Sequence, residues 1–199
     1  ELLDFLRESV TPFHAVRGMC ERLEQAGFES VERFDPSAMV PGRGYFMTKQ
    51  GSSLVALRAG AQELGRGLRL VGAHTDSPNL SVKPNPVTGR DGCVQLGVDI
   101  YGGALLNPWF DRDLALAGRL TVLTAEGELR SVLFDSVSPV AVVPSLAIHL
   151  DREANKQRSI NPQKDVVPLV MLGDAKGFDF KSWLAETLAE QEKTCVGAR

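Results

Sequence analysis

The clearest helical pattern lies in the stretch TPFHAVRGMCERLEQAGF, residues 11–28. Four apolar residues recur there at helical spacing on one face: Val16, Cys20, Leu23 and Ala26. Thr11 is a suitable amino-terminal cap, Pro12 fits the first helical position, and Gly27 can take the left-handed conformation that ends a helix. The pattern predicts a helix over this stretch, and residues 1–9 predict a shorter one.

Two β-rich runs follow in GYFMTKQGSSLVALR, residues 44–58, on either side of the Gln50-Gly51 pair. A short polar pair that contains glycine between such runs predicts a hairpin. Residues 68–73, LRLVGA, are mostly apolar and follow a glycine, so they predict a buried strand. A helix followed by three strands is typical of a mixed α/β layer.

The pattern changes after residue 90. Short β-like runs cover 92–103, 117–134 and 138–144, and Gly127 lies in the turn AEGE. Residues 145–155 predict a helix capped by Ser145, and 162–172 predict an irregular and then extended segment. Residues 179–193 predict an amphipathic helix with an apolar stripe of Phe180, Trp183, Leu184 and Leu188. The sequence thus predicts a β-rich unit with a helix at its end.

Composition narrows the classes of function. The 199 residues are 43% hydrophobic and 24% charged, with a net charge of -3 and no block of like charges, which does not favour binding to nucleic acid or an anionic membrane. No apolar run approaches the roughly 18 residues of a membrane span, and the first residues do not resemble a signal peptide. Three cysteines far apart, without a CxxC pair, favour a reducing compartment, so we expect a cytoplasmic protein.

The candidate chemistry begins with His74 and Asp76, at the end of the predicted strand. Open α/β sheets bind ligands at strand ends, histidine is a common zinc ligand, and a nearby carboxylate can fix its tautomer. The alternative is a histidine that only satisfies a hydrogen bond at a polar turn. The spacing leaves both interpretations open. His14, in the first turn of the first long helix, is expected to be structural or on the surface.

Two further places carry polar residues beside apolar ones. Asp111, Arg112 and Asp113 follow Trp109 and Phe110, a run that is typical of a structural ion-pair cluster, with a wall of an active site as the alternative. His149, in the apolar segment SLAIHL, is by its pattern a core histidine.

Several longer motifs together resemble the aspartyl aminopeptidase family of cytosolic metallopeptidases. The resemblance rests on the blocks GAHTDSPNLSVKPNP (72–86), YGGALLNPWFDRDLALAGR (101–119) and PSLAIHLDREANKQRSINPQKD (144–165), in this order. The stretches TPFHAV and GYFMTKQGSSLVAL match it as well, so the similarity extends to about residue 190.

The resemblance implies a co-catalytic dizinc exopeptidase, with two zinc ions in each complete site, that removes amino-terminal Asp or Glu from peptides. It implies an α/β fold in which a mixed-sheet peptidase domain is interrupted by a β-rich dimerisation domain, and a homo-oligomer that is a dodecamer built from dimers. On this basis residues 1–90 are the first part of the peptidase domain, 91–192 the dimerisation domain, and 193–199 the return to the peptidase domain.

The resemblance also assigns residues. His74 matches the first zinc ligand, and Asp76 matches the carboxylate that orients it. His149 matches a histidine that the dimerisation domain donates to the neighbouring subunit's active site, at the substrate or the developing oxyanion. The other metal ligands and the general base lie later in the family's chains and have no match here, so these residues alone are expected to be inactive. The alternative is a natural truncation that works as a non-catalytic assembly or regulatory module.

Overall fold

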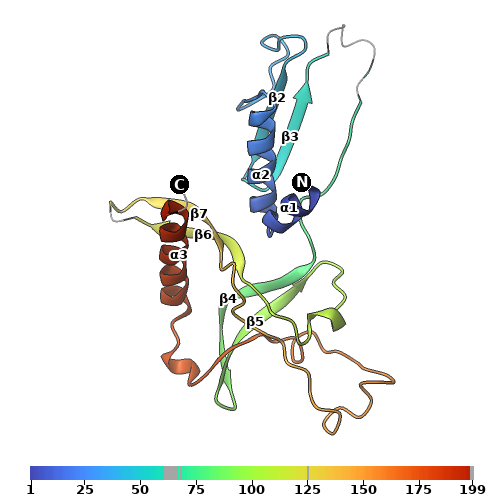
Figure 1. Cartoon of the computed structure of the whole chain (residues 1–199), viewed down its shortest axis with the longest axis vertical. Helices are drawn as coiled ribbons and strands as arrows, with labels where there is room; N and C mark the ends of the chain where they lie inside the picture. Colours follow the sequence, from blue (N-terminus) through green and yellow to red (C-terminus); the bar gives the residue numbers. More distant parts are fainter. Residues whose placement is uncertain (61–66, 68, 125, 198–199) are drawn as a thin grey trace. The chain divides into compact units, whose positions relative to one another are not determined.

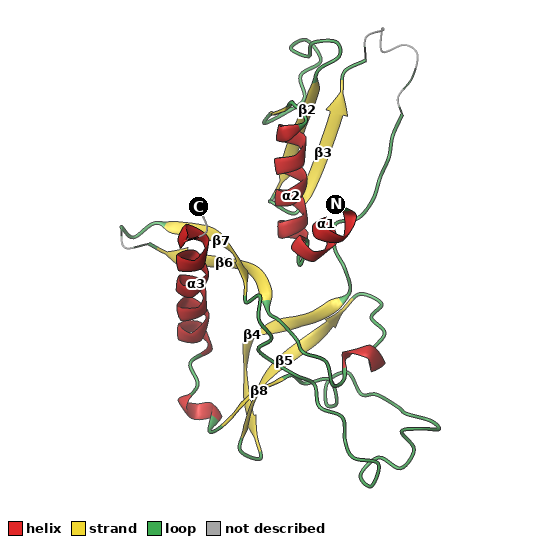
Figure 2. Cartoon of the chain, viewed as in Figure 1, coloured by secondary structure: helices red, strands yellow, loops and turns green. Residues whose placement is uncertain are grey.

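The computed structural model describes residues 1–60, 67, 69–124 and 126–197, which Figures 1 and 2 show with their secondary structure. The chain divides into two compact units. The first comprises Glu1–Ser77 and Gly118–Leu133, and the second comprises Pro78–Ala117 and Phe134–Arg199. The fold is of the mixed α/β class expected from the sequence, with several small sheets. The domain boundaries expected at residues 90 and 192 stay a prediction.

The first unit contains two helices and a three-stranded sheet. The elements are α1 (Leu2–Glu8), α2 (Pro12–Gln25), β1 (Phe28–Ser30), β2 (Gly44–Lys49) and β3 (Ser53–Arg58). In the sheet order β1-β2-β3, β1 runs parallel to β2 and β3 antiparallel to it. Most of the pair formed by β6 (Ala117–Leu123) and β7 (Leu129–Asp135) belongs to this unit too.

Both predicted helices of this unit are confirmed. Thr11 caps α2, because its hydroxyl accepts the backbone N–H of His14 at 3.3 Å, and Gly27 follows the helix at φ 77°. His14 is buried, with its Nδ1 2.7 Å from the same hydroxyl, so its role is structural. The helix packs on the sheet, and Val16 and Phe46 are almost fully buried. Ala26, expected on the apolar face, is exposed instead because it is the carboxyl-terminal cap.

The predicted hairpin at Gln50-Gly51 is confirmed as well. Both residues have positive φ, 54° and 70°, and they lie in a three-residue turn, residues 50–52, between the paired Lys49 and Ser53. At the other end of β2, a Cβ on Gly44 would lie 2.5 Å from the Phe28 ring. Glycine there lets this ring lie directly against the backbone of the neighbouring strand.

The strand predicted at 68–73 is wrong for the residues that the structure describes. Residues 69–73 form no strand, and Leu70 and Val71 are 94% and 95% exposed; residue 68 lies outside the described residues. An apolar run becomes a buried strand only where other strands pair with it and side chains cover it. No such partner is present among the described residues.

The second unit is built on the sheet β4-β5-β8, which is antiparallel throughout. Its strands are β4 (Asn79–Arg90), β5 (Cys93–Tyr101) and β8 (Leu169–Leu172). The sequence did not predict β4, because Pro84 and Pro86 lie inside it. The structure places both prolines where the pairing register shifts between Val82 and Val87, a position at which a strand tolerates proline.

The interior of this unit comes from β5 and from the loops beside it. Val94, Leu96 and Val98 alternate on one face of β5 and are buried. A separate cluster joins Phe110, next to the 3-10 helix η2 (Asn107–Trp109), with two buried valines from the later part of the chain, Val143 and Val166. The loops are therefore held by their own apolar contacts as well as by the sheet.

The helix predicted at 145–155 is wrong, because residues 148–150 and 152–156 form turns. The backbone N–H of Ser145 donates to Oδ1 of Asp111 at 2.8 Å, so Ser145 is fixed by a distant carboxylate rather than placed as a helix cap. The run 138–144 contributes isolated bridges at residues 141–143. The extended segment at 169–172 and the turn at Gly127, with φ 84°, are confirmed.

The last predicted helix is confirmed as α3 (Phe180–Gly197), which follows the 3-10 helix η3 (Ala175–Gly177). Phe180, Trp183, Leu184 and Leu188 are half-buried on one face, as the stripe predicted. Asp179 caps the helix, because its carboxylate accepts the backbone N–H of Lys181 and the hydroxyl of Ser182. In the described part of the chain, no helix combines the length and apolar character needed to cross a membrane.

Replacing Thr11 by Ala is expected to lower the free energy of unfolding by about 1 kcal/mol, because the first turn of α2 loses its side-chain acceptor. Urea unfolding followed by circular dichroism measures this change. Thr11→Ser keeps the hydroxyl and is the matched control. Equal stability of the Ala and Ser variants would contradict the capping role.

The cap of α3 predicts a pH dependence. The hydrogen bonds from Ser182 and Lys181 hold the pKa of Asp179 below 3.8, so the folded state favours the carboxylate. The contribution of Asp179 to the free energy of unfolding is therefore complete above pH 3.8. It is lost as the pH falls through the lower pKa of the folded state. We expect the difference in melting temperature between the wild type and Asp179→Asn to be constant near neutral pH and to shrink below pH 3.8. A difference that does not change with pH would contradict this assignment.

Candidate functional site

His74 and Asp76 lie next to each other in the first unit, in the extended segment before β4. Nδ1 of His74 lies 2.8 Å from the backbone oxygen of Asp76 and 3.1 Å from its Oδ1. Both oxygens are acceptors, so Nδ1 carries the proton and donates it. The imidazole is 81% exposed, and its Nε2 has no partner among the described residues. Nε2 is therefore the ring nitrogen that faces solvent.

The residue between them ties this segment to the sheet. The hydroxyl of Thr75 donates to the backbone oxygen of Ser52, at 2.8 Å, in the turn between β2 and β3. Thr75 is half-buried, whereas His74 is exposed. Thr75 thus attaches the segment to the hairpin, while the ring of His74 beside it stays exposed.

His74, with Asp76 beside it, has the chemistry of one ligand of a zinc ion. Zinc in proteins takes imidazole nitrogen, and a carboxylate on the other ring nitrogen is the usual second contact of such a ligand. His74 and Asp76 provide this pair. Within the described residues no group of three or more His, Cys, Asp or Glu side chains could hold a metal ion. His74 accordingly supplies one ligand, and a complete site needs others.

His149 lies in the second unit, in the turn formed by residues 148–150, and it is exposed. Its ring has no hydrogen-bond partner among the described residues. The interpretation as a core histidine is therefore wrong. Leu146, Ile148 and Leu150 around it are also exposed, at 62%, 46% and 74%. The structure thus brings together His74 and Asp76, and it places His149 on an exposed apolar loop of the other unit.

The ion-pair cluster predicted at 111–113 does not form among the described residues. Asp111 instead accepts the backbone N–H of Ser145, and the side chain and the backbone of Ser145 together lower the pKa of its carboxyl group. Arg112 and Asp113 are exposed and form no ion pair in the described part of the chain. The neighbouring Phe110 ring instead carries the guanidinium of Arg158, 3.9 Å from its centroid. The segment is fixed by long-range contacts that its own sequence does not show.

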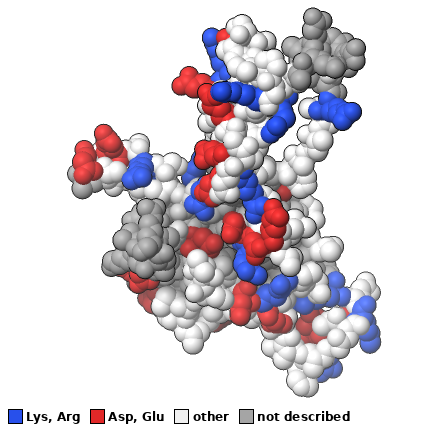
Figure 3. All heavy atoms as spheres, turned by 45° about the horizontal axis from the view of Figure 1, so that its top comes forward, with Lys and Arg blue, Asp and Glu red and all other residues white. Residues whose placement is uncertain are grey.

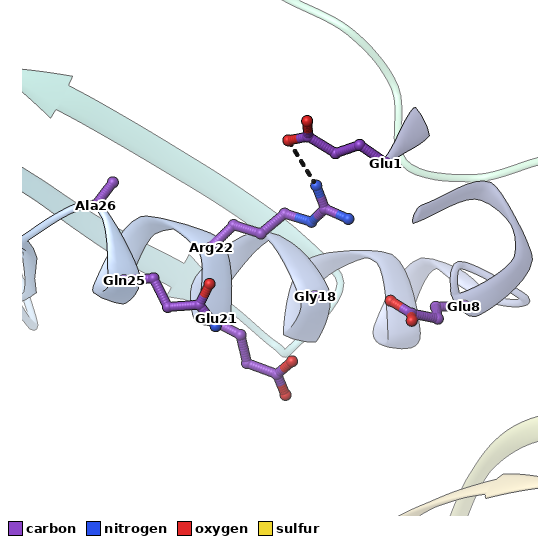
Figure 4. A pocket seen from close by; sticks show the side chains of 7 residues that line it. All are labelled: Glu1, Glu8, Gly18, Glu21, Arg22, Gln25 and Ala26. Carbon is purple, nitrogen blue, oxygen red and sulfur yellow. Dashed lines mark ion pairs between the residues drawn. The ribbon is translucent and has the colours of Figure 1, made fainter. Parts of the chain in front are cut away.

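One hollow on the surface of the described residues lies apart from the three candidate residues. An open hollow of about 600 Å³ borders α1 and α2, and Figure 4 shows Arg22 reaching toward Glu1, at 3.7 Å, while Glu8 and Glu21 line its other parts. Its lining includes none of His74, Asp76 and His149. On the face shown in Figure 3, acidic and basic residues are mixed, and neither sign forms a large continuous field.

Comparison with known proteins gives a family. The family described as aminopeptidase I zinc metalloprotease (M18) matches residues 5–194. A probable M18 family aminopeptidase 2 from Pseudomonas putida (strain GB-1) is 49% identical over 195 residues, which are 96% of this chain and 45% of that protein. The corresponding protein of Azotobacter vinelandii is 50% identical over 195 residues, with the same two shares. The chain thus spans about half the length of the curated relatives it matches.

Solved structures agree with this result. A cryo-EM structure of an Ape4 and Nbr1 complex matches with a TM-score of 0.82 and 38% identity, over 89% of this chain and 34% of that chain. The structure of mApe1 of Chaetomium thermophilum matches with a TM-score of 0.76 and 33% identity, over 88% of this chain and 40% of that chain. The mApe1 dodecamer of S. cerevisiae matches with a TM-score of 0.69 and 27% identity, over 84% and 36%.

These matches cover almost the whole chain, from the first long helix to the last. The matched residues include the segment that contains His74 and Asp76, and the description of the family names it a zinc metalloprotease. The chain therefore belongs to the M18 family of aminopeptidase I zinc metalloproteases.

Proposed function

We propose that this chain supplies part of the active site of a zinc-dependent aminopeptidase that removes amino-terminal Asp or Glu residues from peptides in the cytoplasm. His74 is a zinc ligand, Asp76 orients it, and the remaining ligands and the general base lie outside these 199 residues. The site holds two zinc ions when complete. These residues alone are expected to be inactive.

The observation that carries this proposal is the state of the His74 ring. Its Nδ1 proton is held by Asp76, which leaves the Nε2 lone pair exposed and without a competing protein contact among the described residues. The carboxylate adds a second acceptor for the Nδ1 proton, at 3.1 Å, beside the backbone oxygen of Asp76 at 2.8 Å. Membership in a family described as zinc metalloproteases supports the same assignment.

The chain's own residues then have distinct tasks. Bound zinc would polarise the scissile carbonyl and lower the pKa of a water nucleophile. His74 would donate its Nε2 lone pair to the metal, while Asp76 holds the Nδ1 proton and thereby the orientation of the ring. The preference for an acidic substrate requires a cationic group near its side chain.

We assign His149 to the neighbouring subunit's active site, as a hydrogen-bond donor to the substrate or the developing oxyanion. Its exposure on an apolar loop, with Leu146 and Leu150 beside it, suits a residue that is buried by a second subunit. In this arrangement residues 91–192 form the dimerisation domain, and dimers assemble into a dodecamer. A dodecamer is named for the S. cerevisiae relative, which supports this oligomeric state.

A non-catalytic assembly or regulatory module is the second candidate. It is favoured by one observation, namely that no group of three or more His, Cys, Asp or Glu side chains among the described residues could hold a metal ion. Such a module would form oligomers without binding zinc. Metal analysis and size-exclusion chromatography of the full-length protein that carries this sequence separate the two functions, since only the aminopeptidase requires stoichiometric zinc.

His74→Ala in the full-length protein is expected to abolish the release of Asp from a peptide and to remove zinc, because a direct ligand is lost. Asp76→Asn is expected to weaken zinc binding about 10-fold, because a carboxamide holds the Nδ1 proton less strongly. Zinc content by elemental analysis and peptide hydrolysis measure both effects. Asp91→Asn, at the exposed turn between β4 and β5, is the control. Unchanged zinc and activity in His74→Ala would refute the assignment.

His149→Ala is expected to lower hydrolysis and leave zinc content unchanged, because His149 acts on the substrate and not on the metal. If it acts in a neighbouring subunit, mixing inactive His74→Ala and His149→Ala subunits during assembly restores activity in part. The mixed site then receives an intact metal ligand from one subunit and an intact His149 from the other. Absence of any recovery after verified mixing would exclude this donation.

A further inference from the structure

Separate stretches of the first unit meet at the turn between β2 and β3. The hydroxyl of Thr75 donates to the backbone oxygen of Ser52 at 2.8 Å. Nη1 of Arg119, on β6, donates to the backbone oxygen of Gln50 at 2.8 Å. The same guanidinium lies over the ring of Phe13, 4.2 Å from its centroid, at the start of α2. Residues far apart in the sequence thus share one three-residue turn.

We propose that Thr75 and Arg119 are positioning residues for the zinc ligand His74, acting through the turn Gln50–Ser52. This inference rests on the proposed function, because it gives the turn a role in holding the ligand. Neither side chain touches the metal or the substrate in this assignment. Thr75 acts on the backbone beside His74, and Arg119 acts on the turn that Thr75 contacts.

The first step of the argument is the weak local support of His74. Residues 69–73 form no strand, and the imidazole is 81% exposed, so neither sheet pairing nor burial fixes it. Its contacts with Asp76 orient the ring only relative to its own segment. The bond from Thr75 reaches a residue 23 positions away and thereby fixes the segment relative to the sheet. Thr75 adjoins His74 directly, so loss of this bond displaces the ligand.

The second step is the strain in the turn. Gln50 has a φ of 54°, which a residue with a side chain adopts at a cost, so the turn needs support from elsewhere. Arg119 gives this support by binding the Gln50 carbonyl, two residues before the oxygen that Thr75 uses. A Cβ on Gly51 would lie 3.9 Å from the Phe13 ring and 4.0 Å from Nη1 of Arg119, so both groups pack against the turn.

The third step is the fixed direction of the guanidinium. A planar guanidinium that stacks on an aromatic ring while donating in its own plane has little freedom left. Phe13 belongs to α2, which packs on the same sheet and is capped by Thr11. The position of the turn therefore follows that of α2, and the position of His74 follows that of the turn.

The test measures zinc affinity in the full-length protein by competition with a chromogenic chelator. Thr75→Val keeps the shape of the side chain and removes the donor, and it is expected to raise the zinc dissociation constant about 3- to 10-fold. Thr75→Ser restores the donor and is expected to bind zinc like the wild type. Thr48→Val, at an exposed threonine of β2, is the matched control and is expected to change nothing.

Arg119→Ala is a second variant in case Thr75→Val folds poorly, and it too is expected to raise the zinc dissociation constant. Arg119→Lys keeps a donor but loses the planar stack on Phe13, so its zinc affinity is expected to lie between those of the wild type and Arg119→Ala. Arg130→Ala, at an exposed arginine on the adjacent strand β7, is the control. The melting temperature of the metal-free protein is measured for each variant alongside the affinity.

The outcomes separate this inference from the proposed function. If the wild type binds no zinc, the proposed function fails and this inference fails with it. If the wild type binds zinc while Thr75→Val and Arg119→Ala bind it equally well, only the positioning role is overturned. If these two variants have a lower melting temperature but an unchanged zinc affinity, the positioning role is also overturned. The contacts of Thr75 and Arg119 then stabilise the fold alone.

Discussion

The position of the predicted zinc ligand depends on a hydrogen bond between two loops. Thr75 donates to the backbone oxygen of Ser52 and thereby joins an extended segment to the turn of a hairpin. Such a bond contributes only about 1 kcal/mol net, which is small for a fold but sufficient to select one position of a short segment. His74 gains nothing from burial, so this modest contribution matters more here than it would inside a core.

The turn between β2 and β3 depends in turn on packing in other parts of the first unit. Its positive backbone angles are maintained by the antiparallel pairing of β2 and β3 on one side and by Arg119 on the other. The sheet is held in turn by α2, whose buried Val16 lies in the same unit as the buried Phe46 of β2. The cap of α2 at Thr11 thus lies at one end of a series of contacts that leads, through Phe13, Arg119 and the turn, to the segment of the proposed zinc ligand His74.

Local signals predicted local structure well. The helix at Pro12–Gln25 and the hairpin at Gln50 follow from caps and turn residues that act within a few positions, and the neighbouring His74 and Asp76 meet because they are two residues apart. The predictions failed where contacts between residues far apart in the sequence determine the structure. Asp111 binds Ser145 across 34 residues, and the prolines of β4 lie where its pairing with β5 shifts register, between Val82 and Val87. The contact of Arg119 with Gln50 spans 69 residues and has no local signal.

The failed strand prediction and the proposed zinc ligand concern the same segment. Leu70 and Val71 are almost fully exposed, and covering each of them would stabilise the protein by about 1.5–3 kcal/mol. Any polypeptide that covers them also approaches His74, because only two residues separate Val71 from it. A metal site benefits from such cover, since a drier environment strengthens the contacts of the ion. A polypeptide that covers the apolar run could therefore also supply the further ligands that the proposed zinc site at His74 needs.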